Sequence, residues 1–462
     1  MRIVYLCADR GIPLNGHKGA SVHVRAVAEV LSRRGHDVNV VAVRDAESNP
    51  ELPAAIVSPR FDRVLKDLKK KLQDGAGTTL ASEVQGLLLN SLCLEALEET
   101  HRVAPVDAVY ERYSLWSTAG MQFASRHGIP FVLEVNAPLI AEQREYRALS
   151  LAPVAEAVEI CLFSGADAIF VPSRELKAYV QSKAEGEGRV VVVPNGADLS
   201  RFGAGRKAST ARELCAATPG LAALESASAR HEDKFVVAFV GSLKPWHGVE
   251  LLLASFERLL AGVPDAHLVV VGDGPLMPQV REVASRLGDE AVTVTGSVPH
   301  EEVPGWLALA TVGVAPYPPL DDFYFSPLKV VEYMAAGLPV IASNIGQLSE
   351  LVVSGQTGLL VPPGDVAALT GALSRLAANA PLARRMGRRG RRRAERRHGW
   401  DPVAGKIEQE LEQLRAKYAR RERPAAKPAV ATVAGAMDDA TATAGAKAAV
   451  ATAGPAVMEM AR

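Results

Sequence analysis

The sequence is poor in cysteine and lacks the spacings of metal ligands. Its 462 residues include only four cysteines, namely Cys7, Cys93, Cys161 and Cys215. These lie far apart and form no Cys-x-x-Cys pair, so we expect neither a disulfide framework nor a zinc site. The histidines at positions 17, 23, 247 and 300 show no i, i+4 pair of ligands. The cysteine usage is typical of a reducing cytoplasm.

Long apolar runs and an excess of one charge are also missing. No stretch approaches the roughly 18 apolar residues that cross a bilayer, and the short apolar start ends at Asp9 and Arg10. We therefore expect a cytoplasmic protein without a signal peptide or membrane span, although contact with a membrane surface stays open. Lys plus Arg and Asp plus Glu both number 52, so the net charge of zero attracts no nucleic acid, and we expect no such partner.

What the sequence does have is a regular alternation of short apolar strands and helical stretches. Apolar residues make up 48% of the chain, enough for a sizeable core. The first set of predicted strands lies at 3–8, 38–43, 108–110, 131–135, 168–171 and 190–193. After a polar, Ala-rich interval the second set lies at 235–240, 268–271, 292–295, 312–315, 339–342 and 358–361. This alternation predicts an α/β fold of two doubly wound, Rossmann-like domains facing a cleft.

Turn residues and composition divide the chain further. The cluster at 194–198 places the end of the N-terminal domain at residue 195, followed by a C-terminal domain over 196–398. We predict a C-terminal helix over 399–423 that packs back on the N-terminal domain. Residues 424–462 are mostly Ala with Pro, Gly and Thr, and they have no apolar period, which predicts a disordered tail.

Nine of the fourteen residues from Arg384 to Arg397 are arginine. Such a cluster suits phosphate or anionic lipid, which makes peripheral contact with a membrane one interpretation. A solvated basic helix face is the other, and the pattern alone does not choose between them.

The strongest motif runs over residues 323–340, FYFSPLKVVEYMAAGLPV. A loop containing Pro327 enters a helix that bears Lys329 and Glu332 and ends at Gly337. The start of a helix offers unpaired backbone N–H groups and a positive dipole end, which suit a diphosphate. Lys329 adds a positive charge, and Glu332 can accept hydrogen bonds from a ribose diol. Taken alone, this Lys and Glu pair is also typical of a surface ion pair.

This segment resembles the donor-binding signature of the retaining, nucleotide-sugar-dependent glycosyltransferases of family 4, which have the two-domain GT-B fold. Four other motifs match in the right order, at 193–198 (VPNGAD), 239–248 (FVGSLKPWHG), 271–275 (VGDGP) and 296–300 (GSVPH). The resemblance covers about residues 1–420. It implies that the N-terminal domain binds the acceptor and the C-terminal domain binds the donor.

The resemblance assigns roles to individual residues on the donor side. Glu332 would hold the donor ribose, and the backbone near Val298 would meet the base. Because Pro327 has no N–H, the diphosphate amides would come from Ser326, Leu328 and Lys329. Gly274, in the 271–275 motif, also belongs to the implied donor site.

The N-terminal segment 16–23, GHKGASVH, resembles the glycine-rich loop of the family. The amide of Gly19 would approach the donor phosphate, which the missing side chain of glycine allows. Lys18 and His23 would border the acceptor, and Arg112 would lie on the same side. A plain turn from strand to helix is the alternative interpretation of this loop.

The chain departs from the family at four places. Ser242 and His247 stand where the family usually carries an Arg and a Lys that neutralise the diphosphate, so we expect Lys244 and Lys329 to supply this charge. Tyr324 replaces the earlier of two glutamates in the donor loop. Asn136 replaces a histidine that reaches the donor sugar, and an amide can hydrogen-bond a hydroxyl without acting as an acid or base. We predict Lys244, Lys329 and Asn136 as the catalytic set.

The resulting prediction is an enzyme that transfers a hexosyl unit from a nucleoside diphosphate sugar, UDP-linked, to an acceptor hydroxyl with retention. The acceptor stays open between a glycan end, a lipid-linked sugar and a small molecule. No cofactor is expected. Nor is a metal, because Asp321 and Asp322 have no third carboxylate at a suitable spacing, and the family usually works without one. No protein nucleophile is evident, so the resemblance implies front-face substitution assisted by the leaving phosphate.

Two other functions stay open. A sugar-nucleotide epimerase has the same fold but needs acid and base side chains flanking the sugar. A non-catalytic nucleotide-sugar-binding protein would account for the four departures. A P-loop nucleotidase and a dinucleotide oxidoreductase are disfavoured, because Gly-x-x-x-x-Gly-Lys-Ser/Thr is absent and the glycines after the first strand are too widely spaced.

Overall fold

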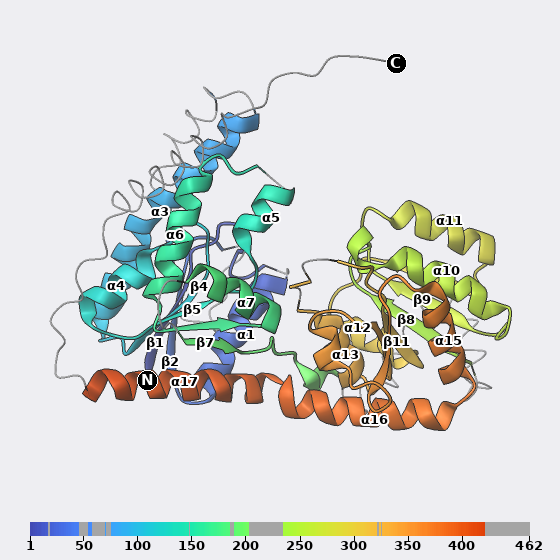
Figure 1. Cartoon of the computed structure of the whole chain (residues 1–462). Helices are drawn as coiled ribbons and strands as arrows, with labels where there is room; N and C mark the ends of the chain where they lie inside the picture. Colours follow the sequence, from blue (N-terminus) through green and yellow to red (C-terminus); the bar gives the residue numbers. More distant parts are fainter. Residues whose placement is uncertain are drawn as a thin grey trace, which may run out of the picture. The chain divides into compact units, whose positions relative to one another are not determined.

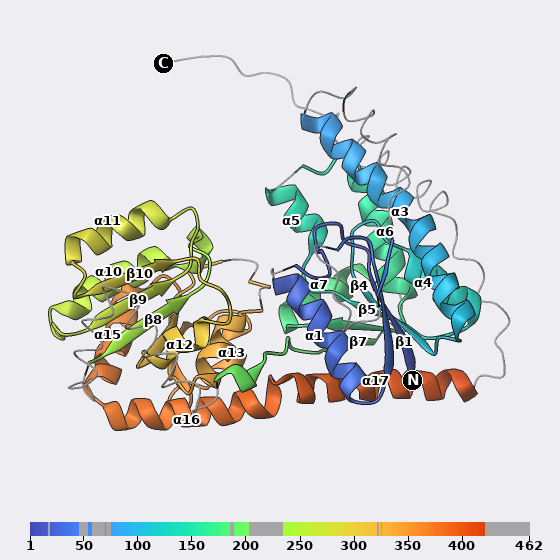
Figure 2. The same ribbon diagram turned by 180° about the vertical axis from the view of Figure 1, so that it is seen from behind.

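The computed structural model of the protein divides into two compact units (Figures 1 and 2). Unit 1 comprises residues 1–171, 176–192 and the chain from Lys406 onward, and unit 2 comprises 172–175 and 193–405. The structure describes residues 1–16, 19–45, 54–57, 70, 75–146, 148–184, 189–202, 234–320, 323–324 and 326–420. The predicted tail over 424–462, together with Lys18, Asp321 and Asp322, lies outside these described residues.

Unit 1 is built on a seven-stranded parallel sheet with the order β3-β2-β1-β4-β5-β6-β7. The strands are β1 (Arg2–Cys7), β2 (Asp37–Ala42), β3 (Ala54–Ile56), β4 (Ala108–Arg112), β5 (Phe131–Glu134), β6 (Ala168–Val171) and β7 (Arg189–Val192). The helices are α1 (Gly19–Arg33), α3 (Gly75–Val103), α4 (Ala119–His127), α5 (Leu139–Tyr146), α6 (Ala152–Gly165) and α7 (Arg174–Lys183). All but β3 were predicted as strands from the sequence. Edge strand β3 was missed because all three of its residues are exposed, so it has no apolar pattern.

The order of the strands places helices on both faces of this sheet. Right-handed crossovers from β1 to β2 and from β4 to β5 run in opposite directions along the sheet, so α1 and α4 cover opposite faces. The two views agree, with α4 and α6 in front in Figure 1 and α1 in front in Figure 2. The carboxyl ends of β1, β4 and β5 consequently meet at one edge.

Unit 2 repeats the plan with six parallel strands in the order β10-β9-β8-β11-β12-β13. They are β8 (Val236–Val240), β9 (His267–Val271), β10 (Val292–Gly296), β11 (Val312–Ala315), β12 (Val340–Ser343) and β13 (Gly358–Val361). The helices are α10 (Val249–Leu260), α11 (Met277–Leu287), α12 (Val303–Ala308), α13 (Leu328–Ala335), α14 (Leu348–Leu351), α15 (Val366–Ala377) and α16 (Ala380–Arg397), with 3₁₀ turns η1 (Leu199–Phe202) and η2 (Pro245–His247). The predicted doubly wound α/β fold is confirmed.

Alternate residues of the unit 2 strands enter two separate apolar cores. Val236 and Ala238 of β8 face a core shared with α12, α13 and α14. Val237 and Phe239 of the same strand face a core shared with α10, α11 and α15. Strands that are apolar on both faces are typical of parallel sheets covered by helices, which is why the sequence shows continuous apolar runs.

Helix α17 (Trp400–Arg420) follows α16, and its part from Lys406 onward belongs to unit 1. There Glu408 accepts hydrogen bonds from Arg34 at 2.5 Å and from His36 at 3.0 Å. The hydroxyl of Tyr418 donates to Asp167 at 2.8 Å. These side chains hold the helix against the turn after α1 and the start of β6.

Helix α16 approaches the loop after α13 through a glycine. Gly387 is buried, and a Cβ added to it would overlap the carbonyl oxygen of Gly337. Gly337 itself has a φ of 75°, a backbone conformation that residues with a side chain disfavour. The turn after α13 therefore also depends on a glycine. The close contact between the two elements therefore requires a glycine at position 387.

Gly387→Ala is expected to lower the free energy of unfolding by about 1–3 kcal/mol, the usual cost of forcing extra volume into a packed contact. Gly371→Ala is the matched control, because Gly371 also lies on a helix of unit 2 and its added Cβ meets nothing within 4 Å. The control should raise the stability by up to about 1 kcal/mol through helix propensity. Urea unfolding measures both, and equal effects of the two substitutions would contradict the packing argument.

Candidate active site

Two glycine loops of unit 2 pack backbone against backbone at the carboxyl ends of β8 and β9. The N–H of Gly241 donates to the carbonyl of Val271 at 2.9 Å, and that of Leu243 donates to Asp273 at 2.9 Å. A Cβ added to Gly274 would lie 2.7 Å from the backbone nitrogen and oxygen of Leu243. Gly274 is therefore needed for this close approach, whatever it does toward a ligand.

Lys329 of α13 reaches the first of these loops. Its Nζ lies 4.5 Å from the centre of the Phe239 ring and 5.4 Å from that of Tyr317. A Cβ added to Gly241 would lie only 2.8 Å from this Nζ, so the glycine leaves the space that the lysine occupies. The Nζ is buried and has no hydrogen-bond partner among the described residues.

The environment of Lys329 disfavours its positive charge. Burial lowers the pKa of Lys329 to about 7, and the charge of Glu332 only partly opposes this effect. In a desolvated site, an aromatic face stabilises an ammonium by about 2 kcal/mol, which is less than the cost of burying the charge without a hydrogen-bonding anion. Such a group is well suited to the oxygen of an anionic ligand.

His247 contributes no positive charge at this place. Its Nδ1 lies 2.6 Å from the carbonyl oxygen of Ser242, to which it must donate, and 3.3 Å from the Oγ of the same serine. Burial, Lys329 and Lys244 together lower the pKa of His247 to about 4. Neutral His247 therefore presents the lone pair of Nε2, and positive charge near the loop comes from the two lysines. The Nζ of Lys244 lies 4.7 Å from the Trp246 ring centre.

At the start of α13, two backbone N–H groups already donate hydrogen bonds to carbonyl groups of the same segment. The N–H of Leu328 donates to the carbonyl of Ser326 at 2.9 Å, and that of Val330 donates to Pro327 at 2.9 Å. The cap position is Pro327, which supplies no side-chain hydrogen bond. The Leu328 amide that we assigned to a diphosphate from the sequence is thus already engaged by a carbonyl of the same loop. Tyr324 is half-buried in the same segment.

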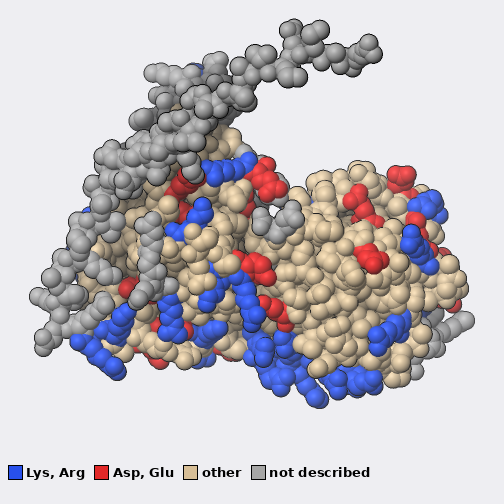
Figure 3. All heavy atoms as spheres, viewed as in Figure 1, with Lys and Arg blue, Asp and Glu red and all other residues tan. Residues whose placement is uncertain are grey.

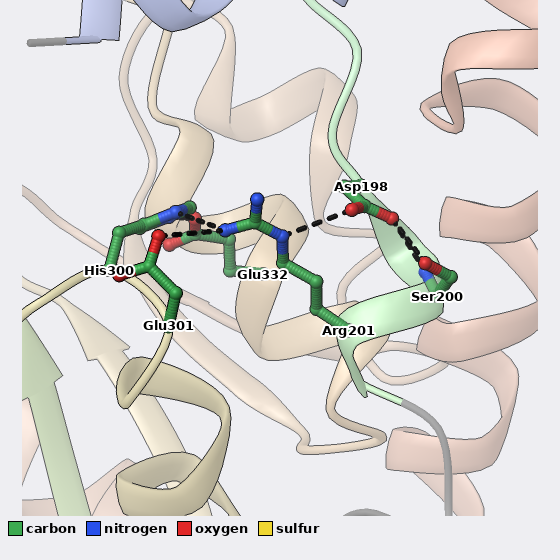
Figure 4. A network of polar contacts seen from close by, with 6 residues as sticks. All are labelled: Asp198, Ser200, Arg201, His300, Glu301 and Glu332. Atoms are coloured by element: carbon green, nitrogen blue, oxygen red, sulfur yellow. Dashed lines mark hydrogen bonds and ion pairs between the residues drawn. The ribbon is translucent and has the colours of Figure 1, made fainter. Parts of the chain in front are cut away.

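Glu332 lies one turn further along α13 and faces polar side chains from two other elements (Figure 4). Its Oε1 lies 2.9 Å from Nε2 of His300, in the loop after β10. The Nδ1 of His300 lies 3.0 Å from Arg201 of η1, whose Nε binds Asp198 at 3.0 Å. Hydrogen bonding to Glu332 raises the pKa of His300. Val298, two residues before His300, packs half-buried on the α13 side of the core.

The side chains of His300, Arg201 and Asp198 were not predicted as site residues. Two of them, Asp198 and His300, close the 193–198 and 296–300 motifs. The signal was their position directly after a strand or turn, where polar side chains of an α/β fold meet at one sheet edge. The sequence does not reveal that they contact one another, because Arg201 and His300 are 99 positions apart.

In unit 1, two predicted acceptor-side residues converge on one carboxylate. Glu134, at the end of β5, is bound by His23 at 2.7 Å and by Arg112 at 3.4 Å. The hydroxyls of Tyr5 and Tyr110 donate to it at 3.0 and 2.9 Å. Burial opposes the ionisation of Glu134, but His23, Arg112 and Tyr110 outweigh it and lower its pKa to about 2. His23 and Arg112 are thereby held in place.

Asn136 follows two residues after Glu134. Its Nδ2 is buried without a hydrogen-bond partner among the described residues. Gly19 begins α1, and a Cβ added there would meet nothing within 4 Å. Packing of the described residues therefore does not require a glycine at position 19, and the close approach of a ligand stays a prediction from the sequence.

Comparison with known proteins bears on the family. The model described as "Glycosyl transferase 4-like domain" matches residues 18–196, and the model described as "Glycosyl transferases group 1" matches residues 234–379. The chain belongs to the family 4 glycosyltransferases. The predicted family is thus confirmed, and both Rossmann-like units of this glycosyltransferase are covered by a match.

Two relatives and one solved structure illustrate the similarity. The D-inositol 3-phosphate glycosyltransferase of Streptomyces avermitilis is 30% identical over 66% of this chain and 64% of its own length. The GDP-mannose-dependent alpha-(1-6)-phosphatidylinositol monomannoside mannosyltransferase of Mycolicibacterium smegmatis is 30% identical over 52% of this chain and 61% of its own. Less than two thirds of the length of each of these two relatives is therefore matched. HepE of Anabaena, solved with UDP and glucose, shares the fold at a TM-score of 0.62 and 19% identity, over 89% of this chain and 99% of its own.

Within the described part of this glycosyltransferase, no three His, Cys, Asp or Glu side chains group so as to hold a metal ion. No helix in that part is long and apolar enough to cross a membrane.

Lys329→Met is expected to change how stability depends on pH. The folded pKa of about 7 lies below the ordinary value of 10.5, so between these values the unfolded chain binds the extra proton and the wild type gains stability as pH rises. The methionine variant lacks this slope. Its thermal midpoint should therefore exceed that of the wild type by the largest margin at pH 7 and by the smallest margin at pH 10.

The control is Lys417→Met, which removes an exposed lysine of α17. Its midpoint should follow that of the wild type in parallel across the same pH range. A parallel curve for Lys329→Met as well would show that burial does not depress the pKa of Lys329.

Proposed function

We propose that this glycosyltransferase transfers a hexosyl unit from a UDP-linked sugar to an acceptor hydroxyl with retention at the anomeric carbon. The observation that carries the proposal is the buried ammonium of Lys329, which lacks an acceptor among the described residues and lies against the Gly241 loop. A nucleoside diphosphate supplies the missing negative charge and is also the group that leaves in the reaction.

Stabilisation of the leaving diphosphate is the main task of the donor loops. Lys329 and Lys244 act on the pKa of the same histidine, so both charges act near the β8 loop. The positive end of the α13 dipole adds to them. Together they replace the Arg and Lys that the family usually carries at positions 242 and 247, while Ser242 and neutral His247 are left for hydrogen bonds.

The proposed step is a substitution on one face of the sugar. The bond between the anomeric carbon and the phosphate oxygen breaks, and the acceptor oxygen bonds to the same carbon from the same side. The acceptor proton passes to an oxygen of the leaving diphosphate. Asn136 would hydrogen-bond a sugar hydroxyl through its unpartnered Nδ2 and would transfer no proton.

Acceptor recognition is proposed for unit 1. His23 and Arg112 would border the acceptor in positions held by Glu134, and Lys18 would join them. Gly19 would let the donor phosphate approach the start of α1. A glycan, a lipid-linked sugar and a small molecule remain the candidate acceptors, and the name of the Mycolicibacterium smegmatis relative adds weight to a lipid.

Donor recognition is proposed for the β10 loop and α13. Glu332 would accept hydrogen bonds from the ribose, Val298 would meet the base, and Tyr324 and Ser326 would line the loop. UDP is the nucleotide bound to HepE, whereas the mannosyltransferase of Mycolicibacterium smegmatis is GDP-mannose-dependent. The affinities for UDP and for GDP are therefore compared to identify which base the protein prefers.

Glu332→Ala should weaken UDP binding by about 10- to 100-fold, because hydrogen bonds to a charged group contribute about 1.5–3 kcal/mol. The affinity for inorganic pyrophosphate should change little, since pyrophosphate has no ribose. Lys329→Met should weaken both ligands. Calorimetry with UDP, GDP and pyrophosphate measures these affinities.

Glu282→Ala, an exposed carboxylate of α11, is the control and should bind like the wild type. Tighter binding of GDP than UDP would overturn the uridine assignment alone.

Release of nucleoside diphosphate from UDP-glucose then separates the alternatives. Release or transfer supports the transferase, inversion of a ring carbon without release supports an epimerase, and binding alone supports a non-catalytic protein.

We also propose that α16 contacts an anionic membrane. Its exposed arginines are Arg384, Arg385, Arg388, Arg389, Arg392, Arg396 and Arg397. At 100° per residue, the first six lie within about 140° of the helix circumference, opposite the buried face. Figure 3 shows basic side chains gathered over α16. The helix carries a single acidic residue, Glu395, which is already paired with Arg391 at 2.9 Å.

A flat layer of lipid phosphates can meet these six guanidinium groups at once. Nothing apolar lies among them, so the contact would be electrostatic and peripheral. No aromatic side chain interleaves with the arginines, which disfavours stacking on single-stranded nucleic acid.

Arg388, Arg389 and Arg392 changed together to Gln should weaken binding to vesicles of phosphatidylglycerol and phosphatidylcholine by about 100-fold at low salt, at about 1 kcal/mol per charge. The matched control changes Arg258, Arg281 and Arg375, which are exposed on α10, α11 and α15, to Gln. It removes the same charge and should bind nearly as the wild type. Co-sedimentation measures both, and tighter binding to duplex RNA than to the vesicles would overturn the lipid assignment.

A further inference from the structure

Four polar side chains of unit 2 form a chain of contacts that ends on Glu332 (Figure 4). Asp198 holds Ser200 and Arg201 at the start of η1, with distances of 2.6 and 3.0 Å. Arg201 reaches Nδ1 of His300 at 3.0 Å, and Nε2 of His300 reaches Glu332 at 2.9 Å. Two segments, 198–201 and the loop that holds His300, are thus tied to the carboxylate of a third.

Arg201 determines which nitrogen of His300 carries the proton. A guanidinium has only donors, so the Nδ1 that faces it must accept the hydrogen bond. Neutral His300 is then protonated on Nε2, which is the atom that faces Glu332. The charged groups around the ring are Glu332, Arg201 and the neighbouring Glu301, which lies 4.0 Å from Arg201. The arrangement presents one directed N–H to the carboxylate.

Stability does not account for these contacts. The side chain of His300 is 50% exposed and that of Arg201 is 33% exposed, and pairs of such exposure contribute little to folding. The carboxylate that they restrain is only 13% exposed. Their effect is to hold a flexible glutamate in one orientation, with its second oxygen left for other hydrogen bonds.

We propose that His300 is a positioning residue, held by Arg201 and Asp198, which orients Glu332 toward the ribose diol of the donor nucleotide. The proposal rests on the function proposed above. It assigns to His300 and Arg201 the distinction between ribose and deoxyribose. A site built to hydrogen-bond a hydroxyl discriminates strongly against ligands that lack it, provided that the acceptor is held rigidly.

The test compares nucleotides that differ only at the ribose. Calorimetry first identifies which of UDP and GDP the wild type binds more tightly, and then measures that nucleotide, its 2′-deoxy analogue and inorganic pyrophosphate. The wild type should prefer the ribonucleotide by at least 10-fold. His300→Ala should reduce this preference to less than 3-fold by weakening the ribonucleotide, with pyrophosphate affinity unchanged. A merely structural role would weaken all three ligands together.

Two further variants sharpen the result. His300→Gln keeps an N–H donor and an acceptor near the same positions, and should restore most of the preference. Arg201→Met removes the contact to Nδ1 and should reduce the preference less than His300→Ala. The matched control is His127→Ala, because His127 makes the same kind of contact with Glu98 at 2.8 Å in unit 1. It should leave the preference as in the wild type, and thermal melting should show that every variant is folded.

Three outcomes overturn the proposal. The preference for the ribonucleotide could persist in His300→Ala, which would show that Glu332 needs no positioning. Binding could become tighter in that variant, which would mean that His300 obstructs Glu332. The wild type could bind neither nucleotide, in which case the proposed function fails as well. The first two outcomes leave the proposed function intact, so the two failures are distinguishable.

Discussion

The site of unit 2 depends on the backbone-to-backbone approach of the loops after β8 and β9. Gly272 and Gly274 allow it, because a Cβ at either position would overlap the backbone of the neighbouring loop. The same absence of a side chain at Gly241 leaves room for the end of Lys329. The aromatic rings beside the Lys329 ammonium come from Phe239 of β8 and from Tyr317 after β11. Burial in this space lowers the pKa of Lys329.

Two buried charged side chains, Glu134 of unit 1 and Lys329 of unit 2, differ in how far their charge is compensated. In unit 1, Glu134 is surrounded by two tyrosine hydroxyls, a histidine and an arginine, so its negative charge is fully compensated within the protein. In unit 2, the Nζ of Lys329 has aromatic faces but no hydrogen-bond acceptor among the described residues. A compensated buried charge has little net effect on stability, whereas an uncompensated one reduces stability until a ligand supplies the opposite charge. This contrast is why the anionic part of a substrate is proposed for unit 2.

The strands were predictable from the sequence because parallel strands buried on both faces are continuous apolar runs, as in β8 and β9. Strand β3 was missed because pairing at a sheet edge leaves no apolar signal when every residue is exposed. Lys329 and Glu332 were predicted from their motif, and the structure places both on α13. The engagement of the Leu328 amide and the neutral state of His247 were not, because both depend on which atoms the fold brings within hydrogen-bond distance.

The sequence by itself determined the α/β alternation, the family resemblance and the residue types of the loops that follow the strands, because these follow from the local order and spacing of residues. Only the tertiary structure decided how those residues act on one another. Arg201, His300 and Glu332 belong to separate segments, and they meet because parallel strands deliver their following loops to the same edge of a sheet. Proton location, burial and pairing are properties of such encounters between distant segments, and the linear order of residues does not contain them.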